Sequence, residues 1–249
     1  MITQTEIEVF IKHLLKAKKD GGSGLAAKTV QDILAVIKSI FRYAKSGQSI
    51  DFHSIKIKSE HKEMRVLTQL EQAKLTSYLN KNADAAKLGV LLSLYMGIRI
   101  GELCALRWQD IDLTAKKLHV KETMQRIANF DGVGAKTKIV ITSPKSGCSL
   151  RTIPLPDFLV VLLKKHQRNP QAYVLTAEKL RWIEPRTLQY RFKSMLKKAG
   201  VADANFHALR HSFSTRAVEI GFDIKTLSEI LGHSKIESVN MTRTLWQMF

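Results

Sequence analysis

Two histidines and one arginine are spaced so that their side chains share one face of a predicted helix. His207, Arg210 and His211 stand three and four positions apart, and residues at these spacings are neighbours on a helix surface. An arginine offers a permanently charged fork of donors, and a histidine can donate hydrogen bonds or move a proton. The spacing therefore predicts a site that binds a phosphate group.

A metal site and a solvated basic face are the other interpretations of this helix. His207 and His211 have the spacing of a zinc-binding helix, but no Glu follows His207, and Cys104 and Cys148 lie far apart in the sequence. A single amphipathic helix would favour the solvated face. We expect no metal ion and no cofactor.

A second pair of charged residues favours the phosphate interpretation. Arg99 follows a glycine break at the start of a predicted helix, and Glu102 stands three positions later. Glu102 can pair with the Arg99 side chain or with the backbone, whereas an exposed pair of this kind would contribute little stability. Downstream, Leu231-Gly232-His233 places another histidine after a predicted helix, with a satisfied core histidine as the plainer alternative.

The charge of the chain points to a polyanionic partner. Its 249 residues carry a net charge of +18 with a pI near 10.0, although the hydrophobic content of 45% is ordinary. No stretch approaches the roughly 18 apolar residues of a membrane span, and no signal peptide leads the chain. Two cysteines offer no disulfide framework. We expect a cytoplasmic protein that binds nucleic acid and no membrane.

Helical periodicity dominates the elements that must position these residues. Asn205 can cap the helix that carries the histidines, and Gly221 can end it. Leu209, Phe213 and Ala217, with Ile220 after them, form the apolar stripe of this helix. Three short strands are predicted at residues 118–120, 139–142 and 151–155, so the fold is mainly α with a small antiparallel sheet.

The predicted helices fall into two groups. Capping boxes at Thr3–Glu6 and Thr68–Glu71 start one helix in each group. Between the groups the chain is polar and basic and has no helical stripe. We predict a partial helical domain over residues 1–45, a basic linker over 46–65 and a larger domain over 66–249. A plain surface loop is an equal alternative for residues 46–65.

Arg99 with Glu102, His207-x-x-Arg210 and Leu231-Gly232-His233 occur in an order that resembles the tyrosine recombinases, the phage integrase family. The resemblance implies the catalytic-domain fold of that family over the larger domain. It also implies that the first domain is a partial core-binding (SAM-like) domain, which helps to clamp double-stranded DNA.

The segment from Ser143 to Gly147, followed by the strand from Arg151 to Leu155, resembles the strand–turn–strand element that carries the family's catalytic lysine. The resemblance assigns that role to Lys145, for which Lys136 and Lys138 compete. The lysine would protonate the departing 5′ oxygen of DNA.

The resemblance also implies roles for the two arginines. Arg99 and Arg210 would clamp the non-bridging oxygens of the scissile phosphate. Charge builds on those oxygens in the transition state, so fixed donors there lower the barrier, and losing one donor costs about 100-fold or more in rate. Because the arginines and a lysine supply the positive charge, no metal is required.

The remaining polar residues have supporting roles in the same scheme. His207 would act as acid or base, and His233 would donate a hydrogen bond to the phosphate. Glu102 would hold Arg99 in place. His211 matches the motif and is assigned a structural role.

The family's nucleophilic tyrosine is missing from its place in this sequence. No tyrosine follows His233, and Thr242 stands roughly where one is expected. A threonine hydroxyl loses its proton far less readily than a phenol of pKa about 10. We expect an integrase truncated at its start and altered at its end, which binds duplex DNA but is defective in forming the covalent phosphotyrosine intermediate.

Two further functions stay open on the sequence. The chain could be a non-catalytic DNA-binding protein derived from an integrase, which would bind DNA without cutting it. A metal-dependent nuclease or hydrolase has less support, because few carboxylates cluster near His207 or His233. We expect a monomer when the protein is free and a homo-oligomer, a tetramer, on DNA.

Overall fold

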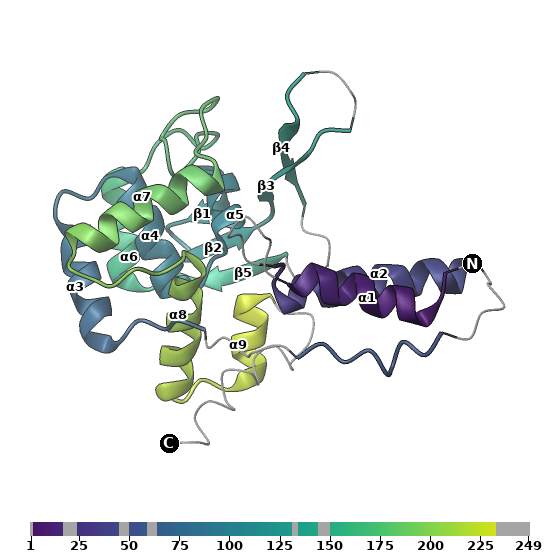
Figure 1. The fold of residues 1–249 in the computed structure, drawn as a ribbon. Helices are drawn as coiled ribbons and strands as arrows, with labels where there is room; N and C mark the ends of the chain where they lie inside the picture. The colour runs from purple at the N-terminus through teal and green to yellow at the C-terminus, as the bar shows by residue number, and fades with distance from the viewer. Residues whose placement is uncertain are drawn as a thin grey trace. The chain divides into compact units, whose positions relative to one another are not determined.

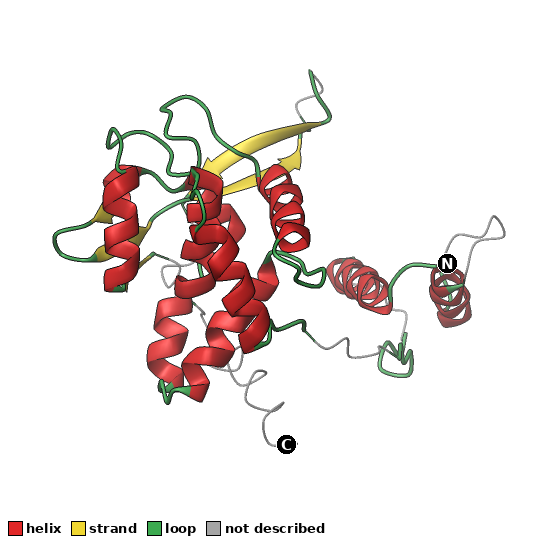
Figure 2. Cartoon of the chain, turned by 90° about the vertical axis from the view of Figure 1, so that its left-hand side faces the viewer, coloured by secondary structure: helices red, strands yellow, loops and turns green. Residues whose placement is uncertain are grey.

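The computed structural model describes residues 2–16, 24–44, 50–58, 64–130, 134–143 and 150–232. The chain divides into two compact units, Met1–Glu63 and Met64–Phe249. Both units are largely helical, and among the described residues strands occur only in the second unit (Figures 1 and 2). The predicted fold class, mainly α with a small amount of antiparallel sheet, is confirmed.

The described part of the first unit contains two helices, α1 (Gln4–Leu15) and α2 (Ala27–Tyr43). The predicted capping box is present at the start of α1, where the Thr3 and Glu6 side chains each bond the backbone of the other. The core between the helices is small and is made by Ile7, Ile11 and Val30.

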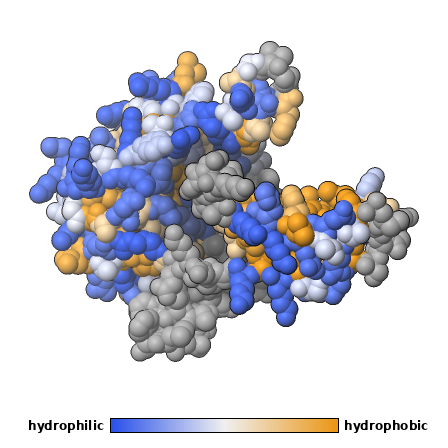
Figure 3. Space-filling view, viewed as in Figure 1, coloured by the Kyte–Doolittle hydropathy of each residue, from blue (hydrophilic) through white to orange (hydrophobic). Residues whose placement is uncertain are grey.

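Part of the predicted linker packs against this small core. Ile50, Phe52, Ile55 and Ile57 are partly buried against it. The stretch therefore lacks a helical stripe because its apolar residues cover the two helices from an extended segment. Apolar side chains remain exposed on the helices themselves (Figure 3): Val9, Phe10, Val36, Ile40 and Tyr43.

The second unit is built around α4 (Ala85–Met96), which is buried on nearly all sides. Helices α3 (Gln69–Asn80), α6 (Asp157–His166), α7 (Pro185–Lys198) and α8 (His207–Glu219) pack against it. The predicted capping box at Thr68–Glu71 starts α3, and Asp84 caps α4. The sequence of α4 is almost continuously apolar, which explains its central position.

The strands form two antiparallel pieces. One sheet has the order β1-β2-β5, from β1 (Ile111–Asp112), β2 (Lys117–Val120) and β5 (Arg151–Pro154). The other is a ribbon of β3 (Thr123–Ala128) and β4 (Thr137–Thr142), which projects from the helices (Figure 2). The sequence predicts β2, β4 and β5 in a single sheet, but β4 pairs with β3 instead.

Helix α8 runs beside α9 (Ile224–Leu231) at one end of the second unit (Figure 1). Asn205 accepts a hydrogen bond from the Ala208 N–H at the start of α8, and Gly221 follows its end with a φ of 89°. The predicted apolar stripe holds for Leu209 and Ala217, whereas Ile220 is 75% exposed.

On the face of α8 opposite the stripe, His207 is exposed but Arg210 is not, so this is not a plain solvated basic face. Arg210 is only 3% exposed, and Ser212, Ser214 and Thr215 are buried as well. The helix is therefore enclosed on several sides, which excludes the plain amphipathic interpretation.

Candidate phosphate-binding site

A glycine turn brings the first arginine of the site into place. Helix α4 ends at Gly97, whose φ is 65°. A Cβ atom added there would lie 2.7 Å from the Phe213 side chain and 2.8 Å from that of Leu231. Only glycine suits this left-handed and crowded position. The turn leads to Arg99, which is the N-cap of the short helix α5 (Ile100–Ala105).

Glu102 connects two arginines that are far apart in the sequence. Its Oε1 accepts from Arg99 Nη1 at 2.8 Å, and its Oε2 accepts from the Arg99 backbone N–H at 2.9 Å. Arg151 donates to the same two oxygens through Nη1 at 2.9 Å and Nη2 at 2.8 Å. The carboxylate is thus shared by two guanidinium groups and one backbone amide.

The Glu102 carboxylate is charged although it is buried. Glu102 is only 4% exposed. Burial by itself raises the pKa of Glu102, but the hydrogen bonds and charges of Arg151, followed by those of Arg99, lower this pKa below its ordinary value. Each oxygen of the buried Glu102 carboxylate therefore has a hydrogen-bond donor, which offsets the cost of burying its charge.

Arg210 reaches the same place from α8. Its Nη1 donates to the Gly97 carbonyl at 2.7 Å, and its Nη2 donates to the Leu231 carbonyl at 2.6 Å. Burial, together with the charges of Arg99 and Arg151, lowers the pKa of Arg210 to about 9. The guanidinium is still cationic at neutral pH, and its side chain is held by backbone carbonyls from two elements.

Three arginines bind three consecutive carbonyls at the C-terminal end of α9. Arg151 Nε donates to Ile230 at 2.6 Å, Arg210 Nη2 donates to Leu231, and Arg99 Nη2 donates to Gly232 at 3.2 Å. The last carbonyls of a helix have no partner inside the helix and lie at the negative end of its dipole. The arginines therefore fix the end of α9, directly before His233.

The charges of this cluster do not cancel. Three guanidinium groups meet one carboxylate, so an excess of positive charge remains around Arg99, Arg151 and Arg210. Arg99 is the accessible member, because 34% of its side chain is exposed. A cationic group of this kind, in partly dry surroundings, is suited to bind an anion such as a phosphate.

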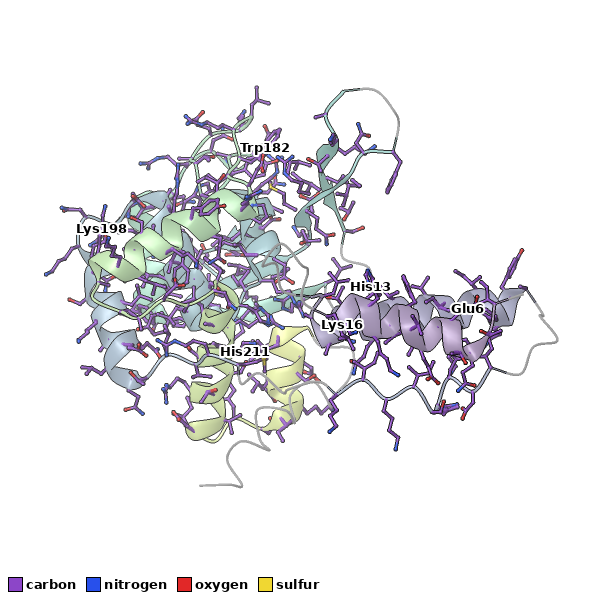
Figure 4. The ribbon with its side chains drawn as sticks, viewed as in Figure 1. Glu6, His13, Lys16, Trp182, Lys198 and His211 are labelled. Carbon is purple, nitrogen blue, oxygen red and sulfur yellow. The ribbon has the colours of Figure 1, made fainter. Side chains whose placement is uncertain are left out.

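The two histidines of α8 are neutral at pH 7. Their rings meet edge to face with centroids 4.4 Å apart. Burial, followed by the charges of Arg210 and Arg99, lowers the pKa of His207. Burial, His207 and Arg210 together lower the pKa of His211 to about 4. Figure 4 labels His211 on α8, close to α9.

The two histidines differ in their surroundings. The side chain of His211 has a buried Nε2 that finds no hydrogen-bond partner among the described residues. The charges that act on His207 come from both arginines that the sequence assigns to the phosphate. The charge of Arg210 acts on both rings, and the charge of Arg99 acts on His207.

Among the predicted site residues, Arg99 pairs with Glu102, and Arg99 and Arg210 bind adjacent carbonyls at the end of α9. The charges of both arginines act on His207. Lys145, His233 and Thr242 lie outside the described residues. Their roles stay predictions. The competing lysines lie on the β3–β4 ribbon, Lys136 directly before β4 and Lys138 within it.

Arg151 is the residue that the sequence analysis missed. The sequence places it only at the start of a strand. Alternation along β5 nevertheless puts Arg151 on the same face as Ile153 and Leu155, which are buried. An arginine on a buried face needs a carboxylate partner, and this signal could have linked it to Glu102.

Among the residues that the structure describes, no three His, Cys, Asp or Glu side chains gather closely enough to hold a metal ion. Within the same ranges, none of the helices combines the length and apolar character needed to cross a membrane.

Comparison with known proteins gives the family of the chain. The model of the Phage integrase family matches residues 65–243. A "Tyrosine recombinase XerC-like" protein of Caldanaerobacter subterraneus subsp. tengcongensis is 30% identical over 240 residues, covering 86% of this chain. The chain spans 61% of the length of that relative.

Solved structures with the same fold include two integrases bound to DNA. The Tn1549 transposon integrase in complex with a circular intermediate DNA has a TM-score of 0.73 at 20% identity, over 97% of this chain and 80% of that one. A lambda integrase tetramer bound to a Holliday junction has a TM-score of 0.64 at 20% identity, over 94% of this chain and 65% of that one. The family match spans most of the sequence and contains the Arg99–Glu102–Arg210 cluster. The chain therefore belongs to the phage integrase family, the tyrosine recombinases.

Proposed function

We propose that this chain binds duplex DNA and holds one phosphodiester at the cluster of Arg99 and Arg210, as a site-specific recombinase of the integrase type. The observation that carries the proposal is that Arg210 and Arg99 bind the adjacent carbonyls of Leu231 and Gly232 at the end of α9. Arg99 also pairs with the buried carboxylate of Glu102. The net charge of +18 supports a DNA partner.

The proposed site would act on the phosphodiester through fixed donors. Arg99 is exposed enough to contact a non-bridging oxygen. The Arg210 guanidinium is fixed by its hydrogen bonds to the carbonyls of Gly97 and Leu231. Donors that are already in position stabilise charge that develops on the phosphate without a cost of reorganisation. His207, neutral at pH 7, would serve as acid or base beside them.

Two residues outside the described ranges complete the proposal. Lys145 would protonate the departing 5′ oxygen, and His233 would donate to the phosphate. In the sequence, His233 directly follows Gly232, whose carbonyl Arg99 binds.

We further propose that strand cleavage is defective in this chain. The expected nucleophile position carries Thr242, and the tyrosines at positions 43, 78, 95, 173 and 190 all precede His207 in the sequence. The alternative function is a non-catalytic DNA-binding protein derived from an integrase. Both functions include DNA binding, and they differ in whether the rest of the cleavage machinery is intact.

A trapping experiment separates the two functions. The chain and a Thr242→Tyr variant are incubated with a labelled pool of nicked duplexes of random sequence, and the products are analysed by denaturing electrophoresis. We expect no adduct with the wild-type chain, because it lacks the phenol. A protein–DNA adduct with Thr242→Tyr would show a defective recombinase whose other catalytic groups are in place.

The remaining outcomes of the trapping experiment are equally informative. Binding of the pool without any adduct from Thr242→Tyr would favour the non-catalytic protein. An adduct with the wild-type chain would refute the proposed defect, and Thr242→Ala and Thr244→Ala variants would then locate the attacking oxygen. A chain that leaves the pool unbound would refute both functions.

A further inference from the structure

We propose that Arg151 is a positioning residue for the phosphodiester site: it holds Arg99 in place through the carboxylate of Glu102 and anchors the end of α9 through the carbonyl of Ile230. The inference rests on the proposed function, because it concerns how Arg99 meets a phosphate. Arg151 itself does not touch DNA in this proposal.

The first step is the geometry of the shared carboxylate. Arg151 donates to both oxygens of Glu102, at 2.9 and 2.8 Å. Two parallel bonds of this kind fix the plane of a carboxylate, which one point charge cannot do. The same oxygens bind Arg99, so the orientation of the Glu102 carboxylate decides where the Arg99 guanidinium lies.

The second step is the burial of Arg151. Its side chain is 5% exposed, as against 34% for Arg99. A long side chain that is free to move loses much conformational entropy when it binds. Arg151 restricts the Arg99 side chain before any ligand binds, because it fixes the orientation of the Glu102 carboxylate to which Arg99 is bonded.

The third step is the bond from Arg151 Nε to Ile230 at 2.6 Å. Arg99 donates to Gly232, two residues further along the same helix end. Arg151 therefore binds the same carboxylate as Arg99 and, at Ile230, the same helix end. Strand β5, helix α5 and helix α9 are joined at this one side chain.

The experiment is a double-mutant cycle on DNA binding by the full chain. The variants are Arg99→Met, Arg151→Met and the double variant, and the probe is a fluorescein-labelled 40-base-pair duplex pool of random sequence. Phosphate contacts carry no sequence information, so a random pool reports them. Anisotropy titrations at several KCl concentrations give the affinity and its salt slope.

The expected result is a loss at Arg151 that acts through Arg99. Arg99→Met should weaken binding roughly threefold to tenfold and reduce the logarithmic salt slope by about one, as for one lost phosphate contact. Arg151→Met should give the same two changes although its side chain is buried. The double variant should be no worse than Arg99→Met alone.

The outcomes separate a failure of the inference from a failure of the proposed function. Binding by Arg151→Met with the wild-type slope, or effects of the two substitutions that multiply, would overturn the positioning role alone. An unchanged slope in Arg99→Met would overturn the phosphate contact of the proposed function, and with it the inference.

A conservative variant and a matched control guard against a purely structural effect. Arg151→Lys keeps the charge but cannot orient both oxygens of Glu102, so it should also lower the slope, and a wild-type slope would overturn the proposal. If Arg151→Met fails to fold, the same cycle is run with Arg151→Lys. Arg216 is the control, because it pairs with Glu219 and donates to the Leu67 carbonyl without touching Glu102. Arg216→Met should change thermal stability, and any effect on binding should multiply with that of Arg99→Met.

Discussion

At Glu102, one carboxylate holds two arginines from different elements while only 4% of its residue is exposed. The spacing of Arg99 and Glu102 alone is compatible with an exposed ion pair, which contributes about 0–1 kcal/mol to stability. Removing one partner from a buried pair costs about 3–5 kcal/mol instead, because the other charge stays behind. Burial therefore decides how much stability is lost when one partner of the Arg99–Glu102 pair is removed.

The burial of Glu102 could not be predicted from its neighbours in the sequence. It is produced by β5 and by the end of α9, which lie far along the chain from α5. The motif residues Arg99, His207 and Arg210 could be predicted, since their types and spacing carry the chemistry. The alternation along β5 indicates that Arg151 lies on a buried face and needs a carboxylate partner, but which carboxylate pairs with it is decided by the fold.

The pH dependence of stability is a prediction at the residue scale. The pKa of His211 falls from an ordinary value of 6.5 to about 4 on folding. The unfolded chain therefore takes up a proton at this ring before the folded protein does, as the pH falls through 6.5. The contribution of neutral His211 is complete above about pH 6.5, and it is lost as the pH falls toward 4.

The measurement is thermal unfolding followed by circular dichroism between pH 7.5 and 4. We expect His211→Gln to show a smaller fall in Tm over this range than the wild-type chain. His53→Gln, a substitution at an exposed residue of the first unit, should follow the wild-type profile. Equal falls in Tm for His211→Gln and the wild type would contradict the prediction.

At the scale of elements, local signals predicted the helices well. The capping boxes Thr3–Glu6 and Thr68–Glu71 both form. A capping box is made within four residues of chain, so its prediction needs no knowledge of packing.

The strands were harder to predict, for a physical reason. In β3, the four residues from Gln125 to Ala128 are all exposed, so apolar and polar residues do not alternate there. Only the start of β3 is anchored in the core, through Met124, and the rest of the strand is held by its pairing with β4. Strand β1 has only two residues, which is too short for any period to appear.

A glycine substitution tests how α4 meets α8 and α9. Gly97→Ala adds a Cβ atom 2.7 Å from the Phe213 side chain and 2.8 Å from that of Leu231, at a φ of 65°. We expect the left-handed backbone to cost about 1 kcal/mol and the crowding to add about 1–3 kcal/mol. Urea unfolding monitored by circular dichroism measures the total.

Gly200→Ala is the matched control for this substitution. Gly200 has a φ of 66°, and no atom lies within 4 Å of the added Cβ. It should therefore show only the backbone cost, and the difference between the two variants isolates the crowding at the end of α9. Equal losses of stability in the two variants would show that the side chains of Phe213 and Leu231 move away from the added Cβ atom at no measurable cost.

For the whole molecule, charge is the property that the sequence predicts most directly. The net charge of +18 needs no structure to be counted, and it points to a polyanion. The structure adds where part of that charge is held: three arginines converge on the end of one helix, from α5, β5 and α8. In the proposed function, the long-range charge would attract DNA, and the cluster would bind one of its phosphates.

The same charge predicts how the molecule assembles. Copies that each carry +18 repel one another in solution, and this repulsion is relieved when DNA phosphates neutralise the surface. We expect sedimentation velocity in 50 mM KCl to show a monomer of 28.2 kDa, and the addition of a 40-base-pair duplex to produce complexes with more than one copy. A stable tetramer without DNA would contradict this prediction. A complex that holds one copy at every protein-to-DNA ratio would contradict oligomer formation on DNA and leave the chain as a single-copy binder.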